Sequence, residues 1–289
     1  MNSNPSFDVP ASTQPRPIGV AYLTLAPLRA PDAVEIAAEA GYDFVGLRVK
    51  PFGAGDPDLQ MGPGSPLLAQ TARRLRETGL RVLDIEFVLL TESVRPSDWL
   101  PALESGAELG ASLLSVAISD PDLSRAEANL AALTADAAAF GIRPSLEPIS
   151  YQPFSGLQDA AAVARRTGAT LLVDPLHLTR TGTDFSLIAD LEPDLVPVLQ
   201  LCDAWAEAPG DGDISQLAHE SRFNRLPVGW GSLPLAALAR AVPAGVPVSV
   251  EVPNEPMRAT MSDREFAAMN LSAARALLQA IEEETEITA

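Results

Sequence analysis

Short apolar runs alternate with amphipathic segments along most of the chain. The runs carry Val, Leu and Ile on consecutive positions, which is typical of parallel strands buried on both faces. The segments between them repeat apolar residues at helical spacing, and several end at a glycine. We therefore expect eight strands, at residues 18–26, 43–49, 81–90, 111–119, 143–150, 170–176, 196–203 and 246–252. We expect helices at residues 31–41, 67–79, 97–109, 122–141, 157–168, 184–191 and 262–283.

Eight strand-then-helix units predict an α/β protein whose sheet closes into a single (β/α)8 TIM barrel. An open, doubly wound sheet is the alternative. Residues 1–16 are rich in Pro, Ser, Asn and Thr without a hydrophobic period, so they predict a disordered leader before a barrel domain at residues 17–289. The segment 204–230 is long for a barrel loop and predicts a lid or mobile cover.

Charge and composition limit the classes of binding partner and the cellular compartment that we expect for this protein. Lys and Arg number 20 against 38 Asp and Glu, and the formal net charge is −18. The resulting field repels phosphate backbones and anionic membranes, so we expect neither nucleic acid nor membrane as a partner. Cys202 is the single cysteine, which rules out an intramolecular disulfide. With no signal-peptide pattern or long apolar stretch, the sequence favours a cytoplasmic protein.

Four of the expected strands end on a side chain with an oxygen suited to a hard metal ion. These side chains are Glu147, Asp174, Gln200 and Glu251. The carboxyl ends of the strands form the active face of a TIM barrel, so the four oxygens are expected to converge. Three carboxylates and an amide, without a thiolate, suit an octahedral divalent ion such as Mn²⁺ or Mg²⁺, and Co²⁺ is also tolerated.

The surroundings of these residues resemble the xylose isomerase-like barrel superfamily over most of residues 17–282. The motifs are EP at residue 147, DPLHLTR from residue 174, QLCDA from residue 200 and VSVEVP around residue 251. The resemblance implies that Glu147 and Glu251 bind the metal and also act as an acid/base pair on opposite faces of the substrate. It implies that His177 points at the substrate and polarises it or transfers a proton.

Further candidates for substrate binding surround this set. Arg225 precedes GWG at the spacing of the family's arginine before Pro-Gly-Glu-Gly, where the arginine binds a substrate oxygen and Trp230 here replaces the acidic residue. Surface ion pairs are the alternative role for the arginines, and an internal salt bridge is the alternative for the strand-end Glu86. The predicted substrate-binding set is Arg225, Arg180, Glu86, Asp203, Arg222 and Trp230.

These features predict a divalent-metal isomerase or epimerase of a small sugar or polyhydroxy carbonyl compound. Tyr151 and Gln152 stand where ketose 3-epimerases carry an Arg and a second Glu, which departs from a plain ketose 3-epimerase. Gln200 in place of His also occurs among dehydratases, so a lyase acting on a cyclic keto-polyol, similar to 3-dehydroshikimate or inosose dehydratase, is the first alternative. A non-catalytic sugar-binding barrel or complex subunit is the second. The resemblance also implies a homodimer or a homotetramer.

Overall fold

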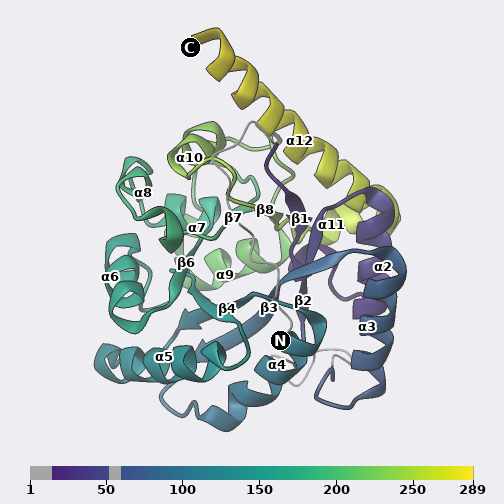
Figure 1. Ribbon diagram of the computed structural model, residues 1–289. Helices are drawn as coiled ribbons and strands as arrows, with labels where there is room; N and C mark the ends of the chain where they lie inside the picture. The colour runs from purple at the N-terminus through teal and green to yellow at the C-terminus, as the bar shows by residue number, and fades with distance from the viewer. Residues whose placement is uncertain (1–14, 52–59, 289) are drawn as a thin grey trace.

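Eight parallel strands close into a barrel in chain order, each hydrogen-bonded to the next and β8 to β1 (Figure 1). The structure is a computed structural model that describes residues 15–51 and 60–288. It confirms the predicted single (β/α)8 barrel and excludes the open sheet. The strands are β1 (Ile18–Val20), β2 (Phe44–Arg48), β3 (Arg81–Leu90), β4 (Leu113–Ile118), β5 (Arg143–Leu146), β6 (Thr170–Val173), β7 (Val198–Leu201) and β8 (Val248–Val250).

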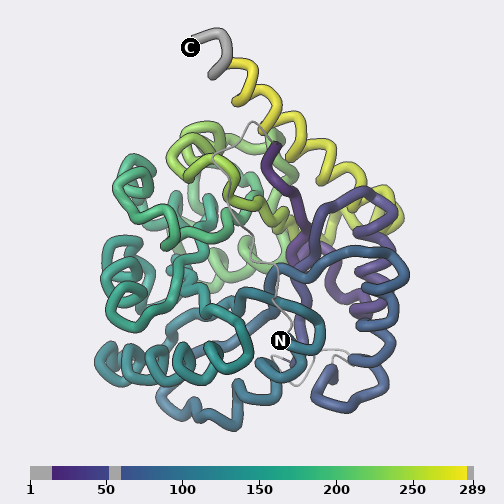
Figure 2. Tube along the Cα trace, in the orientation of Figure 1, coloured from purple at the N-terminus to yellow at the C-terminus, as the bar shows by residue number. Residues whose placement is uncertain are grey.

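Helices surround the barrel and bury its outer face in one large apolar core (Figure 1). The first strand lies beside the last helix, α12, so the two ends of the described chain pack together (Figure 2). The α-helices are α1 (Tyr22–Leu25), α2 (Ala30–Ala40), α3 (Pro66–Thr78), α4 (Pro96–Leu109), α5 (Leu123–Ala138), α6 (Leu157–Thr167), α7 (Pro175–Arg180), α8 (Ser186–Ala189), α9 (Ile214–Phe223), α10 (Leu235–Ala241), α11 (Glu255–Arg258) and α12 (Asp263–Thr288). Short 3-10 turns, η1 (Pro193–Leu195) and η2 (Pro209–Gly212), complete the set.

Local capping explains where several helices begin and end. The Ser65 side chain accepts a hydrogen bond from Leu68 N at the start of α3, and Gly79 ends that helix with φ 73°. Asp122 caps α5 in the same way by accepting from Arg125 N. Ser and Asp are common at the N-cap because their side-chain oxygens accept hydrogen bonds from the free N–H groups of the first helical turn. Glycine is common at the C-terminal end because the backbone there adopts a left-handed conformation. Among the described residues, no helix is both long enough and apolar enough to cross a bilayer.

Some predicted boundaries are wrong. The run at 18–26 is a strand only to Val20 and continues as α1, because Thr24 Oγ1 donates to Val250 O and accepts from Val252 N, which fastens this turn to the end of β8. The run at 170–176 ends at Val173, since Pro175 opens α7. The segment 204–230 holds η2 and α9 rather than an unbroken loop.

Most of the expected leader, residues 1–14, lies outside the described residues. Arg16, the last residue of the predicted leader (residues 1–16), is described and is fixed to the barrel. Its guanidinium donates hydrogen bonds to Ala239 O and Val242 O at the end of α10. The chain is therefore held against the barrel two residues before β1.

Alternate strand residues face the inside of the barrel, which we call the bore, and they form three layers. Period-two alternation places residues i, i+2 and i+4 of a strand on one face. The lowest layer is apolar, the middle layer consists of three serines and an aspartate, and the upper layer consists of three glutamates and a glutamine. The layers contain, in that order, Phe44, Leu113, Leu172 and Val198; Asp84, Ser115, Ser145 and Ser249; and Glu86, Glu147, Gln200 and Glu251.

Two glycines provide the room that the bore needs. A Cβ on Gly19 in β1 would lie 2.1 Å from the Phe44 ring, and a Cβ on Gly46 in β2 would lie 2.9 Å from the Asp84 carboxylate oxygens. Interiors are packed too densely to absorb such overlaps without moving their neighbours. Glycine at these two strand positions therefore lets Phe44 and Asp84 point inward.

Replacing Gly19 by alanine should destabilise the barrel, because the new methyl group collides with the Phe44 ring. We expect Gly19→Ala to lower the free energy of unfolding by about 1–3 kcal/mol. The measurement is chemical denaturation followed by circular dichroism. Gly62→Ala is the matched control, since a Cβ there meets nothing within 4 Å. Equal stabilities of the two variants would contradict the packing argument.

Candidate active site

A cavity of about 270 Å³ opens at the carboxyl end of the barrel. Its walls are residues that end or follow the strands, together with α9, which crosses above them. Among the predicted residues, it is lined by Glu86, Glu147, His177, Gln200, Arg222, Arg225 and Glu251. The fold therefore brings these predicted residues to one place.

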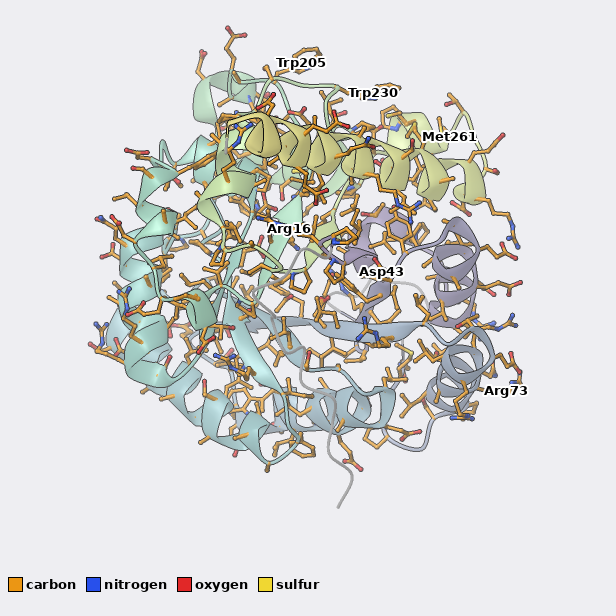
Figure 3. All side chains as sticks on the ribbon, turned by 45° about the horizontal axis from the view of Figure 1, so that its top comes forward. Arg16, Asp43, Arg73, Trp205, Trp230 and Met261 are labelled. Carbon is orange, nitrogen blue, oxygen red and sulfur yellow. The ribbon has the colours of Figure 1, made fainter. Side chains whose placement is uncertain are left out.

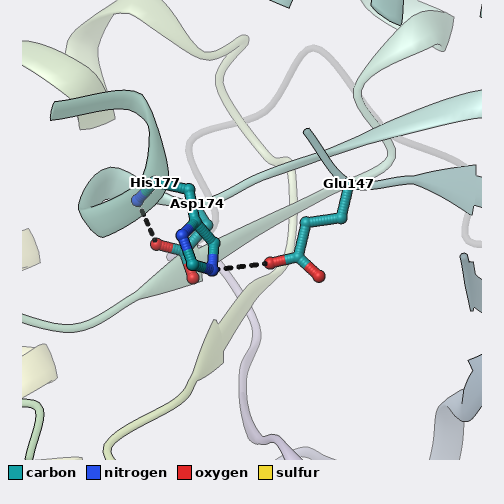
Figure 4. Close-up of side chains that lie close together, drawn as sticks. All are labelled: Glu147, Asp174 and His177. Atoms are coloured by element: carbon teal, nitrogen blue, oxygen red, sulfur yellow. Dashed lines mark hydrogen bonds and ion pairs between the residues drawn. The ribbon is translucent and has the colours of Figure 1, made fainter. Parts of the chain in front are cut away.

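Glu147, Asp174 and His177 form the tightest cluster of potential metal ligands (Figure 4). One ligand atom from each lies within 4.8 Å of the others, and His177 Nε2 is 3.6 Å from Glu147 Oε1. Asp174 is the N-cap of α7, where Oδ1 accepts from the backbone N–H groups of Leu176 and His177. Helix α7, which begins at Pro175, directs the His177 side chain toward Glu147.

Arg225 lies between two of the predicted ligands, and its side chain is only 1% exposed. Nη1 is 2.5 Å from Asp174 Oδ2, and Nη2 is 2.9 Å from Glu251 Oε2. Nε donates to Ser221 O at 2.8 Å. The guanidinium thus bridges two carboxylates from β6 and β8, and Asp174 does not line the cavity.

The backbone after α9 explains how Arg225 reaches this position. Arg225 N donates to Pro253 O, and Asn254 Nδ2 donates to Arg225 O at 2.7 Å. Asn224 and Asn254 form an isolated antiparallel bridge. The residue after α9 is therefore fixed to the segment that follows β8.

Gln200 and Glu251 are paired across neighbouring strands. Gln200 Nε2 donates to Glu251 Oε1 at 3.0 Å. Gln200 Oε1 is buried and has no hydrogen-bond partner within residues 15–51 and 60–288. Glu147 directly follows β5 and Glu251 directly follows β8, so the two carboxylates predicted to act as acid and base lie three strands apart around the barrel.

Burial and mutual repulsion shift the pKa values of these carboxyls. Burial raises the pKa of Glu251 to about 8, with Glu86 and Asp174 adding to the rise against the opposing charge of Arg225. Burial, followed by Glu251 and Asp174, also raises the pKa of Glu147 well above its usual value. Burial opposes ionisation of Asp174 too, but the Arg225 guanidinium outweighs it and lowers that pKa.

His177 is a neutral imidazole at physiological pH. Burial, reinforced by Arg225 and Arg180, lowers the pKa of His177 to about 4 although Asp174 opposes the shift. Nδ1 lies 3.0 Å from Ser150 Oγ, and Nε2 lies 3.3 Å from Ser221 Oγ. Neither serine was predicted from the sequence. Ser221 belongs to α9, which was expected to be loop, so its approach to His177 had no local sequence marker.

Three predicted substrate contacts lie away from the cavity. Arg180 pairs with Glu220 and donates to the backbone oxygens of Trp205 and Ala206, so it fastens α9 to the preceding segment. The Asp203 carboxylate accepts from the N–H groups of the 229–233 turn. Trp230 is 55% exposed at the edge of the molecule, as is Trp205 at 63% (Figure 3). Substrate contact by Arg180, Asp203 and Trp230 stays a prediction.

Two further arginines line the cavity. The Arg222 guanidinium is exposed and lies 5.5 Å from the centre of the Tyr151 ring. Arg48, at the end of β2, pairs with Glu86 at 3.2 Å and stacks over Tyr22. The sequence analysis did not name Arg48, although its place at a strand end was the same marker that identified Glu86.

Comparisons with known proteins agree with this architecture. Residues 34–277 match the family model described as xylose isomerase-like TIM barrel. No curated protein matches the chain by sequence. Among solved structures, a fusion of a xylose isomerase-like TIM barrel with a 4-hydroxyphenylpyruvate dioxygenase is similar, with 21% identity and a TM-score of 0.78. The alignment covers 95% of this chain, which spans only 44% of the fusion protein.

Two other similar structures match over nearly their whole length. The IOLI protein, solved with a zinc atom bound, is 14% identical with a TM-score of 0.74, and 91% of this chain aligns with 98% of it. D-allulose 3-epimerase from Methylomonas sp., in complex with D-allulose, is 16% identical with a TM-score of 0.64, over 91% of this chain and 97% of that one. At these identities the structures establish the fold alone. The family match covers most of the barrel, and the chain belongs to the xylose isomerase-like TIM barrel family.

Proposed function

We propose that this protein is a divalent-metal-dependent isomerase or epimerase of a small polyhydroxy carbonyl compound. The observation that carries the proposal is an excess of buried acidic over basic side chains at the carboxyl end of the barrel. Five buried acidic side chains, Asp84, Glu86, Glu147, Asp174 and Glu251, share the bore with the two arginines Arg48 and Arg225. Uncompensated carboxylates repel one another at low dielectric, so a divalent cation would stabilise the cluster.

The residues present fit such an ion. Glu147, Asp174 and His177 offer ligand atoms within 4.8 Å of one another. Gln200 lines the same cavity as Glu147 and His177, and its role as a ligand stays a prediction. Glu251 completes the oxygen-rich set if it keeps only part of its contact with Arg225. A divalent metal supplies electrostatic stabilisation of negative charge on the substrate oxygens when it is bound. The zinc in the similar IOLI structure supports a divalent metal here.

The chain's own side chains account for the proton transfer. Glu251 and Glu147 line the cavity from strands three positions apart, so a substrate between them presents a different face to each. The pKa of Glu251, raised to about 8, lies near physiological pH, where a group that takes and returns a proton is most effective. The pKa of Glu147 is raised as well. If the oxygen ligands hold the ion without His177, its neutral imidazole can donate its N–H to a substrate oxygen without adding a positive charge. The epimerases among the similar structures support this chemistry.

A dehydratase is the second candidate. The Glu147 carboxyl, with its raised pKa, lies 3.6 Å from His177 and could protonate a leaving hydroxyl once the proton beside the carbonyl has been removed. The first half of this reaction is shared with the isomerase. Reprotonation of carbon in one case and loss of water in the other distinguish the two functions.

Solvent exchange tests the proposal directly. The Mn²⁺-loaded protein is incubated in D₂O with ketoses, inososes and 3-dehydroshikimate, and the C–H beside each carbonyl is followed by NMR. We expect exchange with at least one compound, and its loss in Glu251→Gln. Glu192→Gln is the control, because Glu192 forms an exposed pair with Arg165. Elimination of water would select the dehydratase, and undiminished exchange in Glu251→Gln would contradict the role of that carboxyl.

Arg222 should contribute to substrate binding rather than to proton transfer. Removing one charged hydrogen bond costs about 1.5–3 kcal/mol, so we expect Arg222→Ala to raise KM about tenfold or more while kcat changes little. Steady-state kinetics on the compound identified by exchange provide the measurement. Arg166→Ala, which removes an exposed pair with Glu127, should leave both constants unchanged. A fall in kcat at constant KM would show that Arg222 acts in the reaction step instead.

The metal and Arg225 should both neutralise the carboxylates of Asp174 and Glu251. Removing one partner of a buried ion pair typically costs about 3–5 kcal/mol, so metal-free Arg225→Met should be strongly destabilised. We expect Mn²⁺ to raise its melting temperature by more than it raises that of the parent protein, as measured by differential scanning fluorimetry. Arg165→Met, at an exposed pair, is the control. Equal Mn²⁺ shifts in the parent and Arg225→Met would place the ion away from Asp174 and Glu251.

A further inference from the structure

A second, much smaller cavity lies in the bore one layer below the active site. Its volume is about 10 Å³, which is room for about one water molecule. Ser115 and Gln200 line both cavities, so the two share a wall. The lining of the small cavity is Asp84, Leu113, Ser115, Ser145, Leu172, Val198, Gln200 and Ser249.

Three residues around this cavity each have a buried polar atom that the described part of the chain leaves without a hydrogen bond. These atoms are Asp84 Oδ1, Gln200 Oε1 and Ser249 Oγ. An unsatisfied buried polar atom costs about 1–3 kcal/mol, so three around one small cavity favour a bound ligand there. Ser145 shows the contrast, because its hydroxyl lines the same cavity but is hydrogen-bonded to Thr170 Oγ1 at 2.7 Å.

The position of Asp84 is enforced by the fold. A Cβ on Gly46 would lie 2.9 Å from both of its carboxylate oxygens, so the neighbouring strand is free of a side chain where the carboxyl packs. Asp84 is only 8% exposed, and it forms no salt bridge with any described residue. Asp84 lines the lower cavity and not the active site, so it takes no part in the proposed proton transfer. Asp84 is therefore a buried acidic group whose surroundings in this cavity include three serines and Gln200.

The size and the lining decide between a water molecule and a cation. A hard cation takes six or more oxygen ligands, whereas this cavity offers three unpaired atoms and the apolar side chains of Leu113, Leu172 and Val198. A water molecule typically makes about three hydrogen bonds in a protein interior. It can donate to Asp84 Oδ1 and Gln200 Oε1 and accept from the Ser249 hydroxyl, which satisfies all three atoms.

We propose that one buried water occupies this cavity, and that Asp84 is a positioning residue that fixes the Gln200 amide through it. The water holds the carbonyl oxygen of Gln200 toward the bore. Nε2 of the same amide then donates to Glu251 Oε1 at 3.0 Å. The chain from Asp84 through water and Gln200 sets the orientation of Glu251. Only this last link, to catalysis by Glu251, rests on the proposed function.

High-resolution crystal structures of the parent protein, Asp84→Asn and Asp84→Leu test the site. We expect density for one water within hydrogen-bond distance of Asp84 Oδ1, Gln200 Oε1 and Ser249 Oγ in the parent, and its retention in Asp84→Asn. Leucine should displace the water and release the Gln200 amide from its contact with Glu251. An empty cavity, a metal ion in the cavity, or an unmoved Gln200 in Asp84→Leu would overturn the proposal. Ser249→Val fills the cavity from β8 and serves if Asp84→Leu does not fold.

Kinetics of the exchange reaction then test the link to Glu251. Loss of a partner that orients an active-site group typically costs about 10- to 100-fold in activity. We expect Asp84→Leu to lower kcat by that factor with KM nearly constant, Asp84→Asn to retain most of the rate, and Ser145→Ala to match the parent. An unchanged kcat in Asp84→Leu would overturn the positioning role. If the parent itself shows no exchange, the proposed function fails, while the crystal structures still decide the water site.

Discussion

The central constraint on this barrel is the charge that its converging strands bring together. Glu147, Asp174 and Glu251 follow short buried strands, and the closed sheet places all three at the same end of the bore. Arg225 offsets part of that charge by bridging Asp174 and Glu251 from above. A buried pair of this kind is stable only when its other hydrogen-bonding groups are satisfied. The Arg225 guanidinium also donates to the backbone oxygen and the hydroxyl of Ser221 and to Cys202 Sγ. The segment after α9 and the segment after β8 are therefore fixed to each other by the chemistry of the site.

The layers of the bore have different roles: the lowest layer packs the barrel, and the upper layer carries the candidate active-site side chains. Phe44 and its apolar neighbours close the lower end, where Gly19 leaves space for the aromatic ring. Three serines and Asp84 occupy the next layer, so the side chains of the upper layer lie directly above a small, polar layer. Because each strand contributes alternate residues, one register error would exchange the ionisable layer for outward-facing leucines and valines. The same alternation that builds the barrel thus determines which side chains meet.

Much of this was predictable from sequence, and the exceptions have physical causes. The eight strands follow from apolar runs, and the side chains Glu147, Gln200 and Glu251 follow from their places at strand ends. Asp174 followed by Pro175 is a local helix-start pattern that ends the strand at Val173, which is why the sixth strand is shorter than predicted. Helix α9 has a weak apolar stripe and was predicted as loop. The bridging position of Arg225 depends on a contact between residues 224 and 254 that no local pattern encodes.

Gln200 shows how the charge constraint extends to a single side chain. A glutamate at this position would add a further carboxylate to a cluster in which the pKa of Glu251 is already raised to about 8. An imidazole would offer one donor and one acceptor, but its rigid ring directs them differently. The amide adds no charge, and its two ends do different work: Nε2 donates to Glu251, and Oε1 remains as an acceptor inside the bore. At the boundary between the two cavities, a neutral side chain with both a donor and an acceptor meets the electrostatic limit and both hydrogen-bonding requirements.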